Sequence, residues 1–121
     1  MHAGEIAKYV DDVPDFPEPG IVFRDISPLL REKLHGAIEA MLDLFTKDER
    51  DAVSAFVGLD ARGFIFAPAM AVMTGKGFIM ARKGGKLPEP LFSTEYELEY
   101  GSAELAVKPG EGKVVIVDDV L

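Results

Sequence analysis

The feature that most constrains this chain is a succession of short apolar segments in its second half. Val53–Leu59 is rich in β-forming residues and ends in a turn, and residues 63–74 are apolar nearly all round, as is typical of a helix packed against a sheet. Residues 77–81 and Lys113–Val117 are two further buried-strand candidates. Strand, helix and strand in this order predict a right-handed βαβ unit and therefore a parallel sheet.

Residues 94–107 show a different pattern, because glutamates alternate with apolar or aromatic side chains up to residue 100. Alternation predicts a half-exposed strand, and Gly101-Ser102 offers a turn before residues 103–107. We therefore expect an α/β fold over residues 1–121, with a parallel sheet, flanking helices and an appended antiparallel hairpin at about 94–107.

The N-terminal half combines helical and extended segments. Residues 4–13 have a short helical pattern that nearby prolines end, and residues 21–23 predict a short strand. From residue 31 to residue 47 apolar side chains recur at helical spacing, which predicts the clearest helix of the chain.

The net charge of −8 disfavours binding to nucleic acid or to an anionic membrane. No apolar run approaches the length of a membrane helix and there is no cysteine, so we expect a cytoplasmic protein. Residues 61–88, however, hold five basic residues and no acidic one. This segment indicates either a solvated strip or the site of a small, highly anionic ligand.

The turn that follows the first buried strand is a candidate anion site, formed by Asp60, Ala61, Arg62 and Gly63. Its glycine lets the backbone approach a ligand, the next helix offers free N–H groups, and the arginine fork suits phosphate oxygens. An ordinary turn, with Asp60 capping the helix and Arg62 solvated, would use the same residues.

Three further features fall at predicted strand ends or in the hairpin. Arg82 and Lys86 lie in a glycine-containing basic loop that could cover an anion or simply be solvated. Asp118 and Asp119 follow the last strand, where adjacent carboxylates can hold ribose hydroxyls, position a hydrated cation or form a simple turn. One of the hairpin glutamates, Glu95, Glu97 or Glu99, could act as a general acid or base, although three glutamates on one face usually just face solvent and position alone does not select one of them.

In this order, these segments resemble the adenine phosphoribosyltransferases. The matching stretches are residues 16–26, 58–64, 82–88, 98–101 and 114–121. The resemblance implies a type I phosphoribosyltransferase-like domain, with residues 1–30 as a base-binding segment and residues 31–121 as the core. It also implies a Thr/Gly-rich loop after the acidic pair. Because nothing follows Leu121, we expect the sheet to be incomplete at the C-terminus and the 121-residue chain alone to be inactive.

The resemblance implies a purine-salvage reaction of adenine with phosphoribosyl pyrophosphate, giving AMP and pyrophosphate, in a cytoplasmic homodimer. Mg²⁺ would be held mainly through the pyrophosphate and ribose of the substrate, without a metal site made by the protein. A transferase acting on another purine, or a non-catalytic purine-sensing regulator of the same fold, is the alternative.

The same resemblance implies roles for individual residues. Arg62 and Glu99 would be catalytic, Glu99 by exchanging a proton with the purine. The residues expected to bind substrate are Val22, Phe23 and Arg24 for adenine, Asp60, Ala61, Arg62, Gly63, Arg82 and Lys86 for pyrophosphate, Asp118 and Asp119 for ribose, and Tyr100 on a covering loop. The Asp60–Ala61 peptide bond is expected to be cis.

Overall fold

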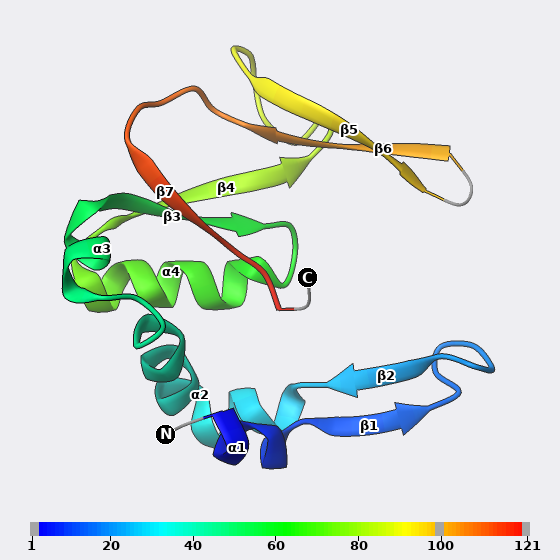
Figure 1. Cartoon of the computed structure of the whole chain (residues 1–121). Coiled ribbons are helices and arrows are strands. Elements are labelled where there is room, and N and C mark those ends of the chain that lie inside the picture. The colour runs from blue at the N-terminus through cyan, green and yellow to red at the C-terminus, as the bar shows by residue number, and fades with distance from the viewer. Residues whose placement is uncertain (1–2, 99–100, 120–121) are drawn as a thin grey trace. The chain divides into compact units, whose positions relative to one another are not determined.

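The computed structural model describes residues 3–98 and 101–119, which form two compact units, Met1–Thr46 and Lys47–Leu121 (Figure 1). The division after Thr46 separates two groups of residues that contact mainly one another. The division at residue 30 implied by the resemblance separates a base-binding segment from the core, so it is a division by ligand role. Within the described residues, no helix is long and apolar enough to cross a membrane.

The first unit begins with a short helix and a two-stranded antiparallel sheet. Its elements are α1 (Ala3–Ile6), the 3-10 helix η1 (Ala7–Tyr9), β1 (Asp11–Pro14), β2 (Val22–Asp25) and α2 (Ser27–Leu42). Strand β2 confirms the strand predicted at residues 21–23, but the helical pattern of residues 4–13 ends at Tyr9. Residues 11–14 are extended because they pair with β2, with Asp11 opposite Asp25 and Pro14 opposite Val22.

The predicted helix over residues 31–47 exists, although both of its boundaries were wrong. Helix α2 starts at Ser27, with Pro28 in its first turn. Proline is tolerated there because a backbone N–H in the first turn has no partner within the helix. Its apolar stripe is buried at Ala37, Ile38 and Leu42, and the helix then ends.

The second unit is a five-stranded mixed sheet with helices. Its elements are α3 (Lys47–Ala52), β3 (Val53–Leu59), α4 (Gly63–Thr74), β4 (Gly77–Lys83), β5 (Phe92–Leu98), β6 (Gly101–Val107) and β7 (Lys113–Val117). The strand order is β5-β6-β4-β3-β7, and β3 is parallel to both β4 and β7. The predicted α/β class, the βαβ unit and the bounds of β3, α4 and β7 are confirmed.

Helix α4 packs along β3 and β4 (Figure 1). Phe56 of β3 and Ala67 and Met70 of α4 are almost completely buried. Two glycines allow close approach at the start of the helix: a Cβ at Gly58 would lie 2.7 Å from the Gly63 carbonyl oxygen, and a Cβ at Gly63 would collide with the Val117 carbonyl oxygen. The beginning of α4 is therefore held against the ends of β3 and β7.

The antiparallel hairpin is confirmed and is longer than predicted. Strand β5 pairs with β6 from Phe92–Val107 to Leu98–Gly101. Gly101 and Ser102, predicted to form the turn, belong to β6. The hairpin joins β4 through Arg82 opposite Ala106 and Lys83 opposite Leu105, so it attaches where β4 ends.

Candidate active site

The parallel strands β3, β4 and β7 end at one edge of the sheet, where ligands collect in open α/β sheets. Four predicted segments continue from these ends or join them. The turn at residues 60–63 follows β3, the basic loop follows β4, the acidic pair follows β7, and the hairpin joins β4.

The turn after β3 has the expected cis peptide bond between Asp60 and Ala61. Asp60 does not cap α4, so that interpretation of the turn was wrong: its Oδ2 accepts a hydrogen bond from the backbone N–H of Lys83 at 3.3 Å and lies 3.7 Å from Arg82 Nε. The first turn of α4 is instead closed by bonds from Phe64 N to Ala61 O and from Ile65 N to Arg62 O, both 3.1 Å. Asp60 therefore faces β4.

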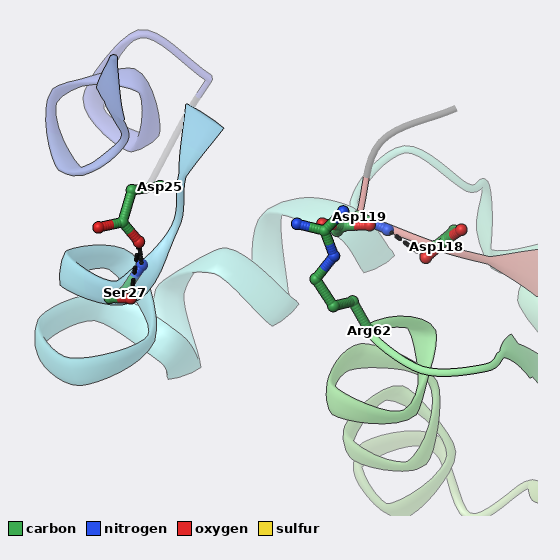
Figure 2. A network of polar contacts seen from close by, with 5 residues as sticks. All are labelled: Asp25, Ser27, Arg62, Asp118 and Asp119. Carbon is green, nitrogen blue, oxygen red and sulfur yellow. Dashed lines mark hydrogen bonds and ion pairs between the residues drawn. The ribbon is translucent and has the colours of Figure 1, made fainter. Parts of the chain in front are cut away.

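Arg62 remains exposed to solvent, as an ordinary turn would have it, but it also reaches the acidic pair. Its Nε lies 2.9 Å from Asp119 Oδ2, and Figure 2 shows the guanidinium turned toward this carboxylate. The Asp119 side chain is only 4% exposed, whereas that of Arg62 is 50% exposed. The pyrophosphate and ribose candidates are thus in direct contact across β3 and β7.

Asp118 shares this polar network (Figure 2). Its Oδ1 accepts a hydrogen bond from the Asp119 backbone N–H at 2.9 Å. Burial raises the pKa of Asp118, and the adjacent Asp119 carboxylate raises it further, while that backbone hydrogen bond and Arg62 oppose the rise. The site therefore disfavours two full negative charges side by side unless a cation or a hydroxyl donor joins them.

The basic loop is anchored at its start. Gly84 N donates to Glu104 O at 2.9 Å, and a Cβ at Gly84 would press on the Glu104 side chain at 3.3 Å. Gly85 has φ of 81°, which glycine adopts readily. Lys86 is exposed, whereas Arg82 is partly buried. The end of β4 and the loop after it therefore present exposed side chains at Lys83 and Lys86 and a partly buried one at Arg82.

The adenine candidates lie on β2 of the first unit. Val22 is exposed, and Phe23 packs edge-to-face on Phe16 with ring centroids 5.2 Å apart. Arg24 forms an ion pair with Asp12 on β1. Neither Phe16 nor Asp12 was predicted as a partner of β2. Asp12 lies on β1, and no pattern within residues 11–14 predicts that strand.

A second omission is the polar start of α2. Ser27 donates from both its backbone N and its Oγ to Asp25 Oδ1, at 2.9 and 2.6 Å (Figure 2). The Ser27 hydroxyl, followed by its N–H, lowers the pKa of Asp25. An acid two residues before Ser-Pro and an apolar stripe is the signal that could have identified this helix start.

Two predicted residues, Glu99 and Tyr100, lie outside the described residues. Within residues 3–98 and 101–119, no group of three or more His, Cys, Asp or Glu side chains could hold a metal ion. In the second unit, the described parts of the site are the turn at residues 60–63, here called the arginine turn, the basic loop and the acidic pair Asp118 and Asp119.

A parallel sheet with an arginine turn and an acidic pair at its carboxyl edge, and with an antiparallel hairpin beside it, has the architecture of a type I phosphoribosyltransferase. No family model matches the chain. An adenine phosphoribosyltransferase from Hydrogenovibrio crunogenus is 50% identical over 121 residues, which are 100% of this chain and 70% of the relative. The chain belongs to the adenine phosphoribosyltransferase family.

Solved structures support the same assignment. The adenine phosphoribosyltransferase from Saccharomyces cerevisiae, complexed with adenine and an imino-altritol bisphosphate, matches with a TM-score of 0.81 and 36% identity over 97% of this chain and 70% of its own. The enzyme from Giardia lamblia, complexed with 9-deazaadenine, matches with a TM-score of 0.79 and 30% identity over 98% of this chain and 68% of its own.

Proposed function

We propose that this protein transfers the phosphoribosyl group of phosphoribosyl pyrophosphate to adenine, giving AMP and pyrophosphate in purine salvage. The observation that carries the proposal is the contact between the arginine turn and the acidic pair, since it joins an anion-binding group to a ribose-binding group. The relatives' names and the adenine-type ligands in their solved structures support adenine as the base.

The chemical demand is charge separation. As pyrophosphate departs, the ribose becomes oxocarbenium-like and negative charge accumulates on the leaving group, so preorganised cations there lower the barrier. Arg62, Arg82 and Lys86 are the candidates for this role. Arg62 uses Nε toward Asp119, which leaves its two Nη groups for phosphate oxygens. One guanidinium could therefore link the pyrophosphate to the carboxylate that receives the ribose.

The acidic pair would orient the sugar. Ionised carboxylates only accept hydrogen bonds, so Asp118 and Asp119 suit the two vicinal hydroxyls of ribose. Val22, Phe23 and Arg24 remain the candidates beside adenine, and Glu99 remains the candidate that exchanges a proton with the purine. Loop closure near Tyr100 would exclude water from the activated sugar.

Magnesium is part of the proposal. Mg²⁺ prefers oxygen ligands and commonly binds through substrate phosphates and one or two carboxylates, and Asp118 and Asp119 provide such oxygens. When bound, it would neutralise charge on the pyrophosphate. Removing Mg²⁺ with EDTA should abolish turnover, and restoring it should recover turnover.

The homodimer and the cytoplasmic location also stay predictions. Sedimentation of the purified protein would test the dimer.

The function is tested by incubating the full-length parent protein with phosphoribosyl pyrophosphate, Mg²⁺ and one base at a time. Adenine should give AMP, whereas guanine and xanthine should give no nucleotide. Product from guanine or xanthine but not adenine would contradict the adenine assignment. Adenine binding without turnover would favour a purine-sensing regulator. The Glu99→Gln variant separates these cases, because a catalytic role requires a much larger loss of turnover than of binding.

A further inference from the structure

Asp60 follows β3, but its bonds go to β4. Its backbone N donates to Ala81 O at 2.9 Å, extending the parallel pairing in which Leu59 lies opposite Ala81. Its Oδ2 accepts from Lys83 N at 3.3 Å and lies 3.7 Å from Arg82 Nε. The side chain is only 12% exposed. Asp60 therefore ties the turn after β3 to two consecutive residues at the end of β4.

Arg82 depends on this carboxylate. Its Nε is buried and makes no hydrogen bond, and a buried polar group without compensation is costly. The Asp60 carboxylate supplies the opposite charge at that nitrogen, while 34% of the arginine side chain stays exposed. Arg62 is arranged in the same way, with its Nε facing Asp119. Each arginine is therefore held at Nε by an aspartate.

A direct contact between Asp60 and pyrophosphate is chemically unfavourable. An ionised carboxylate has no proton to donate to a phosphate oxygen, and the two groups carry like charges. By contrast, a carboxylate that fixes Nε leaves the Nη groups of the guanidinium for an anion. The same oxygen also anchors Lys83, the residue from which the basic loop begins.

We propose that Asp60 is a positioning residue: it orients Arg82 and fixes the start of the basic loop so that both can bind pyrophosphate, without itself contacting the substrate. The inference rests on the proposed function because it takes pyrophosphate as the ligand. It assigns Asp60 a role through β4 instead of a place among the groups that contact the substrate.

Titration of the purified protein with pyrophosphate tests whether Asp60 strengthens or weakens pyrophosphate binding. Asp60→Ala should weaken binding about tenfold, the loss expected when one charge-assisted contact is mispositioned. If Asp60 acted only as a nearby negative charge, its removal would tighten binding. Asp51→Asn removes an acid on α3 of the same unit and should leave the affinity unchanged. Tighter or unchanged binding by Asp60→Ala would overturn the proposal.

A double-mutant cycle tests whether Asp60 acts through Arg82. In an Arg82→Ala background, adding Asp60→Ala should weaken pyrophosphate binding by clearly less than about tenfold, because only the anchoring of Lys83 is then lost. A full loss in that background would mean that Asp60 acts independently, and would overturn the proposal. So would an Arg82→Ala variant that binds pyrophosphate normally. The formation of AMP from adenine is a separate measurement, so failure of the function and failure of this inference are distinguishable.

Amide exchange at Lys83 provides a readout that does not require a ligand. In Asp60→Ala the Lys83 amide should exchange roughly fivefold faster or more, because it loses its acceptor. In Asp60→Asn, which keeps a side-chain oxygen, it should stay protected while pyrophosphate binding still weakens. The asparagine variant also serves if the alanine variant does not fold. Unchanged Lys83 exchange in a folded Asp60→Ala variant would overturn the anchoring role.

Discussion

Arg62 Nε and Asp119 Oδ2 lie 2.9 Å apart, but the two side chains differ in exposure, at 50% for the arginine and 4% for the aspartate. The Asp119 side chain cannot become solvated without opening the site, whereas the Arg62 side chain can. Asp119 Oδ2 is buried and has no hydrogen bond of good geometry, so the ion pair is its compensation. The two partners therefore depend on each other unequally.

This asymmetry predicts unequal costs of mutation. Arg62→Gln should lower the free energy of unfolding by about 1–3 kcal/mol, because it leaves a buried carboxylate without its countercharge. Asp119→Asn should cost less than about 1 kcal/mol, because the arginine left behind is half exposed. Urea unfolding of both variants measures the difference. Arg31→Gln, which changes an exposed arginine, is the control, and equal losses at Arg62 and Asp119 would contradict the prediction.

The raised pKa of Asp118 predicts a pH dependence of stability. Because burial disfavours the charged form, the unfolded chain ionises first as the pH rises through the usual value of 3.8. The contribution of Asp118 to stability therefore falls from that pH up to its folded-state pKa and is constant above it. Asp118→Asn should thus gain stability relative to the unchanged protein as the pH rises, measured by urea unfolding across the acidic range.

Asp51 is a control of opposite sign for this prediction. The Lys47 side chain, 2.8 Å away, lowers the pKa of Asp51 by hydrogen bonding and charge. Its contribution is present above 3.8 and is lost as the pH falls through its folded-state pKa. Asp51→Asn should therefore lose stability relative to the unchanged protein as the pH rises. The same trend in both variants would rule out our account of Asp118.

The sequence predicted the sheet unit better than the first unit, for a physical reason. β3, α4 and β7 are continuous apolar segments, so their bounds were predicted correctly. The burial predicted for residues 113–117 was wrong, because Val114 and Ile116 of β7 are exposed. β1, with the residues Asp11–Pro14, is polar and exists because β2 pairs with it. Long-range pairing of this kind leaves no local signal.

The site was predicted at the level of its segments but not of its contacts. Charge and residue type identified Arg62, Arg82 and the acidic pair. Their partners depend on the strand order, which places β7 on one side of β3 and β4 on the other. The pairing of Arg62 with Asp119, and of Asp60 with Arg82, follows from that order and could not be read from spacing along the chain.

The Asp25–Ser27 contact predicts a shift that carboxyl titration by NMR can measure. Ser27→Ala removes the hydroxyl that lies 2.6 Å from Asp25 Oδ1, so the lowered pKa of Asp25 should move back toward 3.8. Ser27→Thr keeps a hydroxyl and should retain most of the depression. Because a lowered pKa stabilises the fold above 3.8 and less so as the pH falls, the alanine variant should lose stability at neutral pH. An unchanged Asp25 pKa in the alanine variant would show that the hydroxyl bond is not formed.

Gly63, the glycine of the turn at residues 60–63, is expected to tolerate substitution poorly. A Cβ there would collide with the Val117 carbonyl oxygen, and backbone cannot move aside as a flexible side chain can. Gly63→Ala should therefore lower the free energy of unfolding by about 1–3 kcal/mol, as overpacking typically does.

Gly110→Ala is the matched control, since a Cβ at that position meets nothing within 4 Å. Its effect should stay within about 0.5 kcal/mol. The collision also pushes α4 away from the end of β7, so Gly63→Ala should disturb the contact between Arg62 and Asp119 and weaken pyrophosphate binding. Urea unfolding and pyrophosphate titration of the two variants measure both effects. If Gly63→Ala were as stable and bound as tightly as Gly110→Ala, the close approach of α4 to β7 would not be required for the site.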